Sequence, residues 1–134
     1  TDLPAIYSQC GVFLYPSLRE SFGIPMLEAM ACAVPVITSN TSSMPEVAGD
    51  AAMIIDPYKP EEIKAAMLRL CNNKDVAATL VSKGISRAAE FSWKAMAEEV
   101  LKIYTEVGAA TGISKQVLKP EIKKPFLLSD KPIG

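Results

Sequence analysis

Short apolar runs alternate with amphipathic stretches along the first half of the chain. The runs at residues 12–15, 36–38 and 52–55 are bounded by turn-forming residues, which is typical of short buried strands. Residues 26–33 repeat apolar positions on one helical face, and residues 45–47 predict a turn or short helix. Because parallel strands require helical crossovers, this alternation predicts an α/β fold with a parallel sheet.

The second half of the chain has helical periodicity. A stripe of apolar residues predicts a helix that begins near Pro60 and ends at residues 72–73, and a second helix is expected to stop near Gly84. A third helix opens with Ser92 as N-cap and is expected to end at Gly108. The five stripe residues of this third helix are Trp93, Met96, Val100, Tyr104 and Val107.

The end of the chain differs in composition from the rest. Residues 109–134 carry five lysines against two acidic residues, and three prolines interrupt any regular element. We therefore divide the chain into a folded part, residues 1–108, and a basic, proline-containing tail, residues 109–134. The tail is expected to be flexible surface, with contact to an acceptor domain or to an anionic membrane as alternatives.

Three strands make only part of a doubly wound sheet, which usually has about five or six. The fold class predicted is a partial Rossmann-like parallel sheet with helical crossovers and a C-terminal helical segment. The first residues have neither an initiator Met nor a signal-peptide pattern, so we expect the chain to derive from a longer polypeptide. An incomplete sheet exposes an edge strand, which predicts self-association of the isolated segment.

The amino-acid composition limits which catalytic groups, metal sites and binding partners this chain can have. The sequence has no histidine, which removes the commonest general base and the commonest transition-metal ligand. A net charge of −1 gives no attraction to nucleic acid, and no apolar run is long enough to span a bilayer. Three cysteines among apolar neighbours, Cys10, Cys32 and Cys71, predict reduced core residues and a cytoplasmic location.

The loop after the first strand carries the candidate chemistry. It lies at the carboxyl edge of the sheet, where open α/β sheets bind ligands, and it leads into a helix whose first amides can bind phosphate. Gly23 would allow close approach to the backbone, and Pro25 fits the first turn. Glu20 and Glu28 could bind the hydroxyl groups of a ligand. The alternative from spacing alone is that Glu20 caps the helix and Glu28 makes surface pairs.

Glu20 and Glu28, separated by Ser-Phe-Gly-Ile-Pro-Met-Leu, resemble the EX7E motif of the GT4-type (group 1) glycosyltransferases. The resemblance continues through residues 29–37, through residues 45–52 and at Phe91-Ser92-Trp93, and it covers roughly residues 1–107. It implies the later part of a GT-B C-terminal domain, which binds a nucleotide diphosphate sugar. Relatives often carry glycines near Thr41 and Ser42, and an aspartate cap at Lys59, where this chain predicts a weaker cap.

The resemblance also implies the roles of individual residues. Catalysis would use Glu20 with the backbone of Gly23 and Ile24, which stabilises the departing diphosphate. Glu20 would bind sugar hydroxyls, Glu28 the ribose, and Leu27 would pack near the nucleoside. No metal and no cofactor are expected. The substrate-binding residues expected are Glu20, Phe22, Gly23, Ile24, Leu27, Glu28, Ser39, Asn40 and Thr41.

The implied reaction transfers a hexose, with retention, to a glycan or a lipid-linked acceptor. The acceptor domain and the upstream half of the donor domain are absent from this sequence, so the segment alone is expected to be inactive. The stretch from Ser39 to Pro45 resembles several mannosyltransferases, which makes GDP-mannose a first guess for the donor. Two other functions stay open: a non-catalytic sugar-nucleotide-binding or scaffold module, and a GT-B-fold sugar epimerase.

Overall fold

A computed structural model describes residues 2–111 of the chain, and the side chains up to residue 110. Residues 2–90 form one compact α/β unit, and helix α6 belongs to a second unit that is described by itself. The tail predicted for residues 109–134 lies almost wholly outside the described residues. The α/β fold class predicted from the sequence is confirmed.

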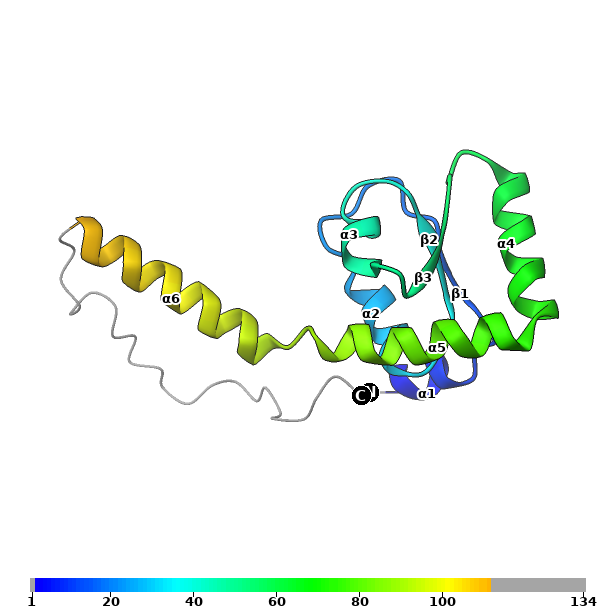
Figure 1. Ribbon diagram of the computed structural model, residues 1–134, viewed down its shortest axis with the longest axis horizontal. Coiled ribbons are helices and arrows are strands. Elements are labelled where there is room, and N and C mark those ends of the chain that lie inside the picture. Colours follow the sequence, from blue (N-terminus) through cyan, green and yellow to red (C-terminus); the bar gives the residue numbers. More distant parts are fainter. Residues whose placement is uncertain (1, 112–134) are drawn as a thin grey trace. The chain divides into compact units, whose positions relative to one another are not determined.

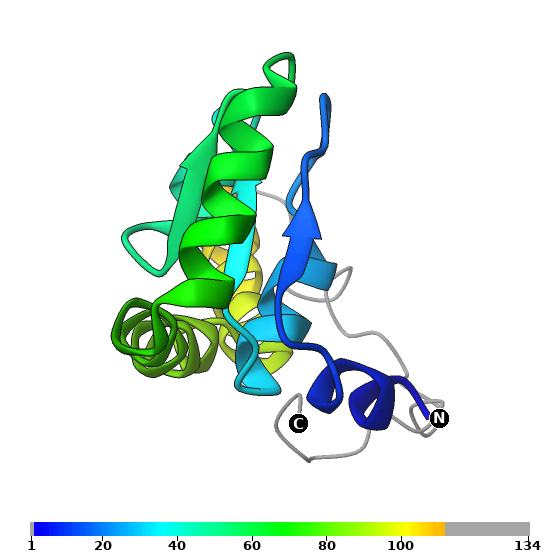
Figure 2. The same ribbon diagram turned by 90° about the vertical axis from the view of Figure 1, so that its right-hand side faces the viewer.

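The sheet has three parallel strands in the order β1-β2-β3. Strand β1 (Phe13–Tyr15) pairs with β2 (Val36–Ser39), and β2 pairs with β3 (Ala52–Ile55). The three predicted strands are therefore present, within a residue of their expected bounds. Figure 2 shows β1 along one side of the sheet, with helix α1 (Leu3–Ser8) near its start.

Helices cover both faces of the sheet. Helix α2 (Ile24–Ala31) and helix α3 (Met44–Ala48) lie on one side in Figure 1, and helix α4 (Pro60–Asn72) lies on the other. On the α4 side, Ile37 and Ile55 pack with Ala66 and Leu70 in a buried apolar cluster. Strand β2 is buried along its whole length, which explains its continuous apolar run, whereas β1 and β3 are only partly buried.

Helix α5 (Lys74–Ala89) crosses the end of the unit and contacts α2 and α4 (Figure 1). The prediction that this helix stops near Gly84 is wrong, because it continues for five more residues. Gly84 is buried against α2: a Cβ at this position would lie 3.2 Å from Cγ of Met30 and 3.3 Å from its Cβ. The glycine therefore serves close helix packing and does not end the helix.

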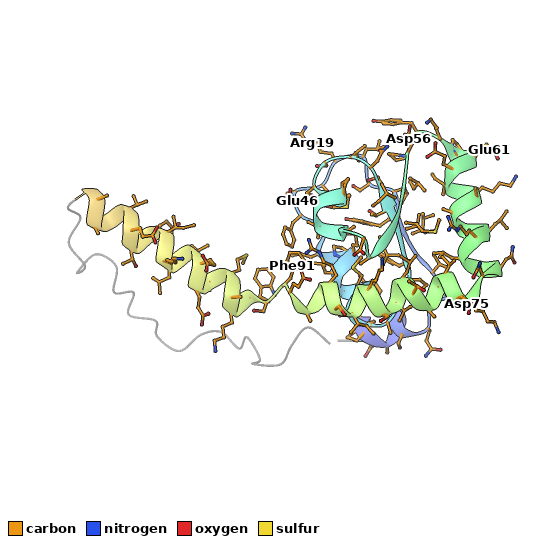
Figure 3. The ribbon with its side chains drawn as sticks, viewed as in Figure 1. Arg19, Glu46, Asp56, Glu61, Asp75 and Phe91 are labelled. Carbon is orange, nitrogen blue, oxygen red and sulfur yellow. The ribbon has the colours of Figure 1, made fainter. Side chains whose placement is uncertain are left out.

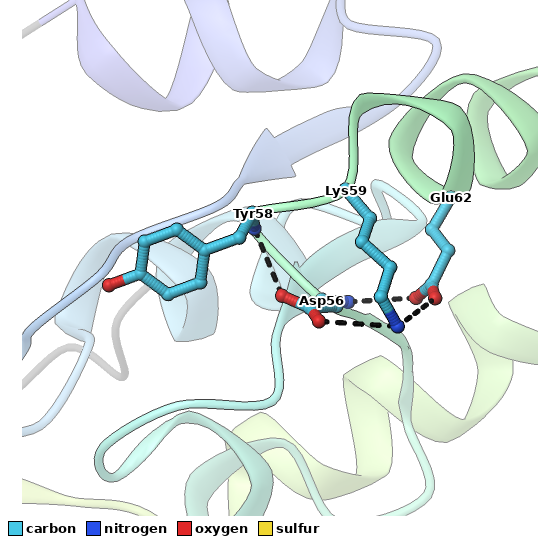
Figure 4. A network of polar contacts seen from close by, with 4 residues as sticks. All are labelled: Asp56, Tyr58, Lys59 and Glu62. Atoms are coloured by element: carbon cyan, nitrogen blue, oxygen red, sulfur yellow. Dashed lines mark hydrogen bonds and ion pairs between the residues drawn. The ribbon is translucent and has the colours of Figure 1, made fainter.

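Helix α4 begins without a side-chain cap from Lys59, as expected. Instead the turn before it is held by a small polar network, drawn in Figure 4. A carboxylate oxygen of Asp56 accepts from the Tyr58 amide at 3.0 Å, and Glu62 accepts from the Asp56 amide at 3.0 Å. Lys59 forms ion pairs with both carboxylates. The bond from the Asp56 amide, and after it the bond from Lys59, hold the pKa of Glu62 below its usual value.

Helix α6 (Trp93–Thr111) begins as predicted, since the Ser92 hydroxyl accepts from the Ala95 amide at 3.0 Å. It does not end at Gly108 but runs on to Thr111, so a glycine within a long helical stretch is tolerated here. Within the described residues of this second unit, all five residues of the predicted apolar stripe are exposed.

The cysteines differ from the expectation. Cys10, Cys32 and Cys71 are free, but Cys10 and Cys71 are exposed and Cys32 is only half-buried. They are therefore not core residues. Cys10 follows the last turn of α1, where its thiol donates to the Ile6 carbonyl at 3.3 Å, and apolar neighbours in sequence did not indicate burial there.

Candidate functional site

The loop of residues 16–23 connects β1 to α2 at the carboxyl edge of the sheet. Figure 3 shows Arg19 on this loop at the same end of the unit as Asp56, which follows β3. Gly23 is the N-cap residue of α2 and has a left-handed backbone, with φ of +93°. Pro25 occupies the first turn, as predicted. The loop and the start of the helix thus lie where an open parallel sheet binds ligands.

Gly23 is close to protein on the side where a side chain would stand. A Cβ there would lie 2.4 Å from Cε of Met44, which is fully buried at the start of α3. The glycine is needed for its φ angle and for this packing, whether or not a ligand also approaches. Ile24 and Phe22, on either side, are partly exposed, at 37% and 40%.

Glu20 is held in place by neighbours that precede α2. Its carboxylate accepts from the Tyr15 hydroxyl at 2.6 Å and from the Ser21 amide at 3.0 Å. The Tyr15 bond, followed by that amide, holds the pKa of Glu20 below its usual value. Glu20 therefore stays ionised and is not a cap of α2, which was the alternative left open by its spacing.

Glu28 lies one turn into α2 and is half-buried. Its carboxylate accepts from the Tyr7 hydroxyl of α1 at 3.1 Å. Burial of Tyr7, together with this bond and the charge of Glu28, raises the pKa of Tyr7 to about 12. The second acidic residue of the motif is thus bonded to a buried tyrosine, which differs from the surface pair that was its alternative.

An aromatic row connects the two acidic residues. The ring of Phe13 contacts that of Tyr7 edge-on, with centroids 5.4 Å apart, and stacks with that of Tyr15 at 5.8 Å. Phe13 and Tyr15 share one face of β1, since side chains alternate along a strand. Glu20 and Glu28 therefore lie at the two ends of one row along the β1 flank, and the structure brings them onto the same side of the unit.

The segment after β2 contacts the loop through its hydroxyl groups. Ser39, which is fully buried, and Thr41 both donate to the Ser17 carbonyl, at 2.5 and 2.9 Å. The structure thus places them against the loop of residues 16–23, where they hold its backbone. Asn40, between them, has an exposed side chain, and its amide donates to the Ile55 carbonyl at 2.8 Å.

Two serines that were not predicted as site residues hold the loop at its other end. Ser42 and Ser43 both donate to the Glu20 carbonyl, at 2.5 and 3.1 Å. Ser42 has a φ of +57°, a left-handed conformation that glycine adopts most readily, which fits the glycine that the family resemblance led us to expect near here. The hydroxyl-rich run at residues 38–43 was the signal available in the sequence for these contacts.

Leu27 lies apart from the exposed loop residues. It is 6% exposed and packs in the core under α2, so little of its surface is open to a ligand. Among residues 2–111, no group of three or more histidine, cysteine or acidic side chains is arranged to hold a metal ion. Within the same range, no helix is long and apolar enough to cross a membrane.

Comparison with known proteins adds to this geometry. The chain is 39% identical over 103 residues to the O-antigen chain mannosyltransferase B of Escherichia coli, which covers 77% of this chain and 27% of that protein. It is 32% identical over 111 residues to a D-inositol 3-phosphate glycosyltransferase of Corynebacterium jeikeium, covering 81% of this chain and 26% of the relative. The chain thus spans about a quarter of the length of these relatives.

The fold agrees with these sequence matches. The sucrose-phosphate synthase of Thermosynechococcus elongatus superposes with a TM-score of 0.71 at 30% identity, over 78% of this chain and 27% of that one. The family described as Glycosyl transferases group 1 has a sequence model that matches residues 1–87, which include β1 to β3, the loop, and both acidic residues. The chain belongs to the group 1 glycosyltransferase family.

Proposed function

We propose that this chain is the later part of the donor-binding domain of a retaining glycosyltransferase. The enzyme moves a hexose from a nucleotide diphosphate sugar to a glycan or a lipid-linked acceptor. The observation that supports the proposal is the placement of Glu20 and Glu28 on one flank of β1, one before the start of α2 and one within it. Family membership supports the chemistry, and this placement supports Glu20 and Glu28 as the residues that bind the donor.

The loop and the helix start serve different parts of the donor. The amides of Gly23, the buried N-cap residue of α2, and of Ile24, its first residue, would bind the diphosphate and stabilise the charge that grows as it leaves. Glu20, ionised and held by Tyr15, accepts hydrogen bonds from sugar hydroxyls. Glu28 accepts from the ribose hydroxyls, with the exposed Phe22 near the sugar.

The two acidic residues bind and orient the donor. They are not the acid and nucleophile of a glycosidase pair, and the reaction requires no metal. Ser39 and Thr41 contribute through the backbone of the loop, and the exposed Asn40 side chain is the member of that segment open to the donor. Leu27 acts through the packing of α2 below the nucleoside.

Mannose is the sugar that the names of several relatives indicate. The protein matched at 39% identity is named a mannosyltransferase, and so are Escherichia coli WbdA at 33% and an α-(1→4)-mannosyltransferase of Mycolicibacterium hassiacum at 33%. GDP-mannose is therefore the donor to test first. Turnover requires the acceptor domain and the rest of the donor domain, so the 134-residue chain alone has no transferase activity.

The test is donor binding to the longer polypeptide that contains this chain, measured by titration calorimetry with GDP-mannose. Glu28→Ala should lose about 1.5–3 kcal/mol of donor binding, the usual worth of a hydrogen bond to a charged group, or a loss of affinity of about tenfold or more. Glu61→Ala is the matched control, because Glu61 is an exposed residue of α4 that pairs with Lys64. Equal affinities for the parent and Glu28→Ala would remove Glu28 from the site.

A further inference from the structure

Helix α3 packs against the loop of residues 16–23, which is named the donor loop from here on. Its first residue, Met44, packs under Gly23, and the Ser43 hydroxyl just before it donates to the Glu20 carbonyl at 3.1 Å. The helix has only five residues, and a helix of this length has little stability of its own. Core packing of α3 and the hydroxyls of Ser39, Thr41 and Ser42 also hold the loop, so what fixes α3 at its other end contributes part of the loop's support.

Arg87 of α5 fixes that other end. Its Nε donates to the Val47 carbonyl at 2.9 Å and one of its terminal nitrogens donates to the Glu46 carbonyl at 2.8 Å; Glu46 is labelled in Figure 3. These carbonyls belong to the last turn of α3, where helices leave carbonyls unpaired. A cation at this end also interacts favourably with the helix dipole. The Arg87 side chain is 27% exposed and also pairs with Glu90.

The turn after α3 fits around this side chain. Gly49 has a φ of +57°, and a Cβ at this position would lie 3.5 Å from Nε of Arg87. One turn earlier on α5, Lys83 pairs with Asp50 at 2.7 Å; the Lys83 side chain is 44% exposed and that of Asp50 82%. Lys83 therefore resembles Arg87 in charge and in place, but its pair lies beyond the end of α3 and leaves the α3 carbonyls untouched.

We propose that Arg87 is a positioning residue for the donor loop. It holds α3 by the carbonyls of its last turn, and α3 in turn holds Glu20 through Ser43 and Gly23 through Met44. The consequence for donor binding rests on the proposed function, whereas the mechanical link from α5 to the loop does not. No part of Arg87 needs to touch the donor for this effect.

Hydrogen exchange on the full 134-residue chain tests the link without any ligand. Arg87→Gln should speed exchange of the amides in α3 and in residues 16–23 by about tenfold, the factor expected when a hydrogen bond from a charged group is lost. Lys83→Gln, which removes one positive charge from the same helix, should leave these amides unchanged. Arg87→Lys keeps the charge but cannot donate to both carbonyls in the same geometry, so its exchange rates should lie between those of the parent and Arg87→Gln.

A double-mutant cycle separates transmission through α3 from general loosening. Ser43→Ala removes the hydroxyl that links the start of α3 to the Glu20 carbonyl and leaves the Ser42 bond in place. Its effect on loop exchange should therefore be smaller in the Arg87→Gln background than in the parent. Additive effects, or faster exchange confined to α5, would overturn the proposal. Circular dichroism identifies a variant that has lost its fold, and in that case Arg87→Lys decides the cycle instead.

Titration of the longer polypeptide with GDP-mannose then separates the two proposals. If the parent binds this donor, Arg87→Gln should weaken binding and Lys83→Gln should not. If the parent binds no nucleotide sugar while the exchange results hold, the proposed function fails and the link through α3 stands. If the parent binds the donor and the loop amides do not respond to Arg87→Gln, the link fails and the proposed function stands.

Discussion

At the scale of single residues, the acidic pair depends on tyrosines outside the motif. Tyr15 donates to Glu20 and Tyr7 donates to Glu28, and a ring contact through Phe13 joins the two tyrosines. Each carboxylate is thereby given one orientation before any ligand arrives. Such preorganisation lowers the entropy that binding would otherwise lose.

Replacing Tyr15 by Phe should raise the pKa of Glu20 toward its usual value. The Tyr15 hydroxyl is the largest cause that lowers this pKa, and its bond to the carboxylate favours the charged form. The parent should therefore keep Glu20 ionised to a lower pH than the variant does. An NMR titration of the side-chain carboxyl carbon measures this, with Tyr58→Phe, at an exposed tyrosine after β3, as the control. Identical titration curves for parent and Tyr15→Phe would contradict the assignment.

Replacing Gly23 by Ala should destabilise the unit by about 1–3 kcal/mol, the usual cost of a left-handed backbone in a residue with a side chain. The new methyl group would also displace Met44, whose Cε lies 2.4 Å from its position. Urea denaturation measures the change, and Gly11→Ala is the control because nothing lies within 4 Å of a Cβ there. A free energy of unfolding equal to that of the control variant would show that neither strain nor packing acts at Gly23.

The resemblance to the family motif singled out the acidic pair, but it gave no indication of the contacts that hold the pair. The family motif identifies Glu20 and Glu28 in the sequence. Gly23 can be identified because it directly precedes a predicted helix, a position at which glycine is common. The Tyr7–Glu28 bond joins residues 21 apart, and the Ser39–Ser17 bond joins residues 22 apart. No local pattern encodes such pairings, since they form only when the strands and helices pack.

At the scale of elements, the close packing of α5 on α2 requires a residue without a side chain at position 84. Gly84→Leu should cost about 1–3 kcal/mol of unfolding free energy, the usual effect of inserting a side chain into a packed core. Cβ and Cγ of Met30 are close to their own backbone and cannot move aside easily. Ala78→Leu, at an exposed position of the same helix, is the control for helix propensity. Thermal unfolding measures both, and a variant as stable as its control would contradict close packing at Gly84.

The positions of elements were predictable where the spacing of apolar residues and the length of the apolar run indicate the same type of element. The three strands, α2, α3 and α4 all follow from apolar runs and helical stripes in the sequence. The predicted ends of α5 and α6 are wrong, because Gly84 and Gly108 lie inside these helices, although glycine often follows a helix end. At Gly84 tertiary packing decides the role of the glycine, and propensity alone cannot show which helix will lie against it.

At the scale of the whole compact unit, stability should depend on pH in the alkaline range. Tyr7 ionises near its usual pKa of 10 in the unfolded chain and at about 12 in the folded one. Between these values the unfolded state binds fewer protons, so the free energy of unfolding should fall as the pH rises from 10 to about 12. Urea denaturation across this range measures the fall, which should be smaller in Tyr7→Phe. Equal slopes for the two proteins would contradict the role of Tyr7.

The α/β class and the family were predictable for the unit as a whole, because apolar runs separated by helices and a long motif carry that information. An edge strand was expected from a partial sheet, and β1 and β3 are the edge strands of the described sheet. Which of the candidate residues are buried and which are exposed was not predictable. Ser39 and Leu27 were expected near the donor, and their burial is a property of the assembled core.

The loop of residues 16–23 is fastened through its carbonyl oxygens, at Ser17 and Glu20, and hardly at all through the side chains of Leu18 and Arg19, which point outward. Substitutions at those two outward positions can therefore change the chemistry presented at this rim while its curvature stays constant. Positions 18 and 19 are therefore suited to natural variation or to a randomised library that changes binding specificity with little loss of stability.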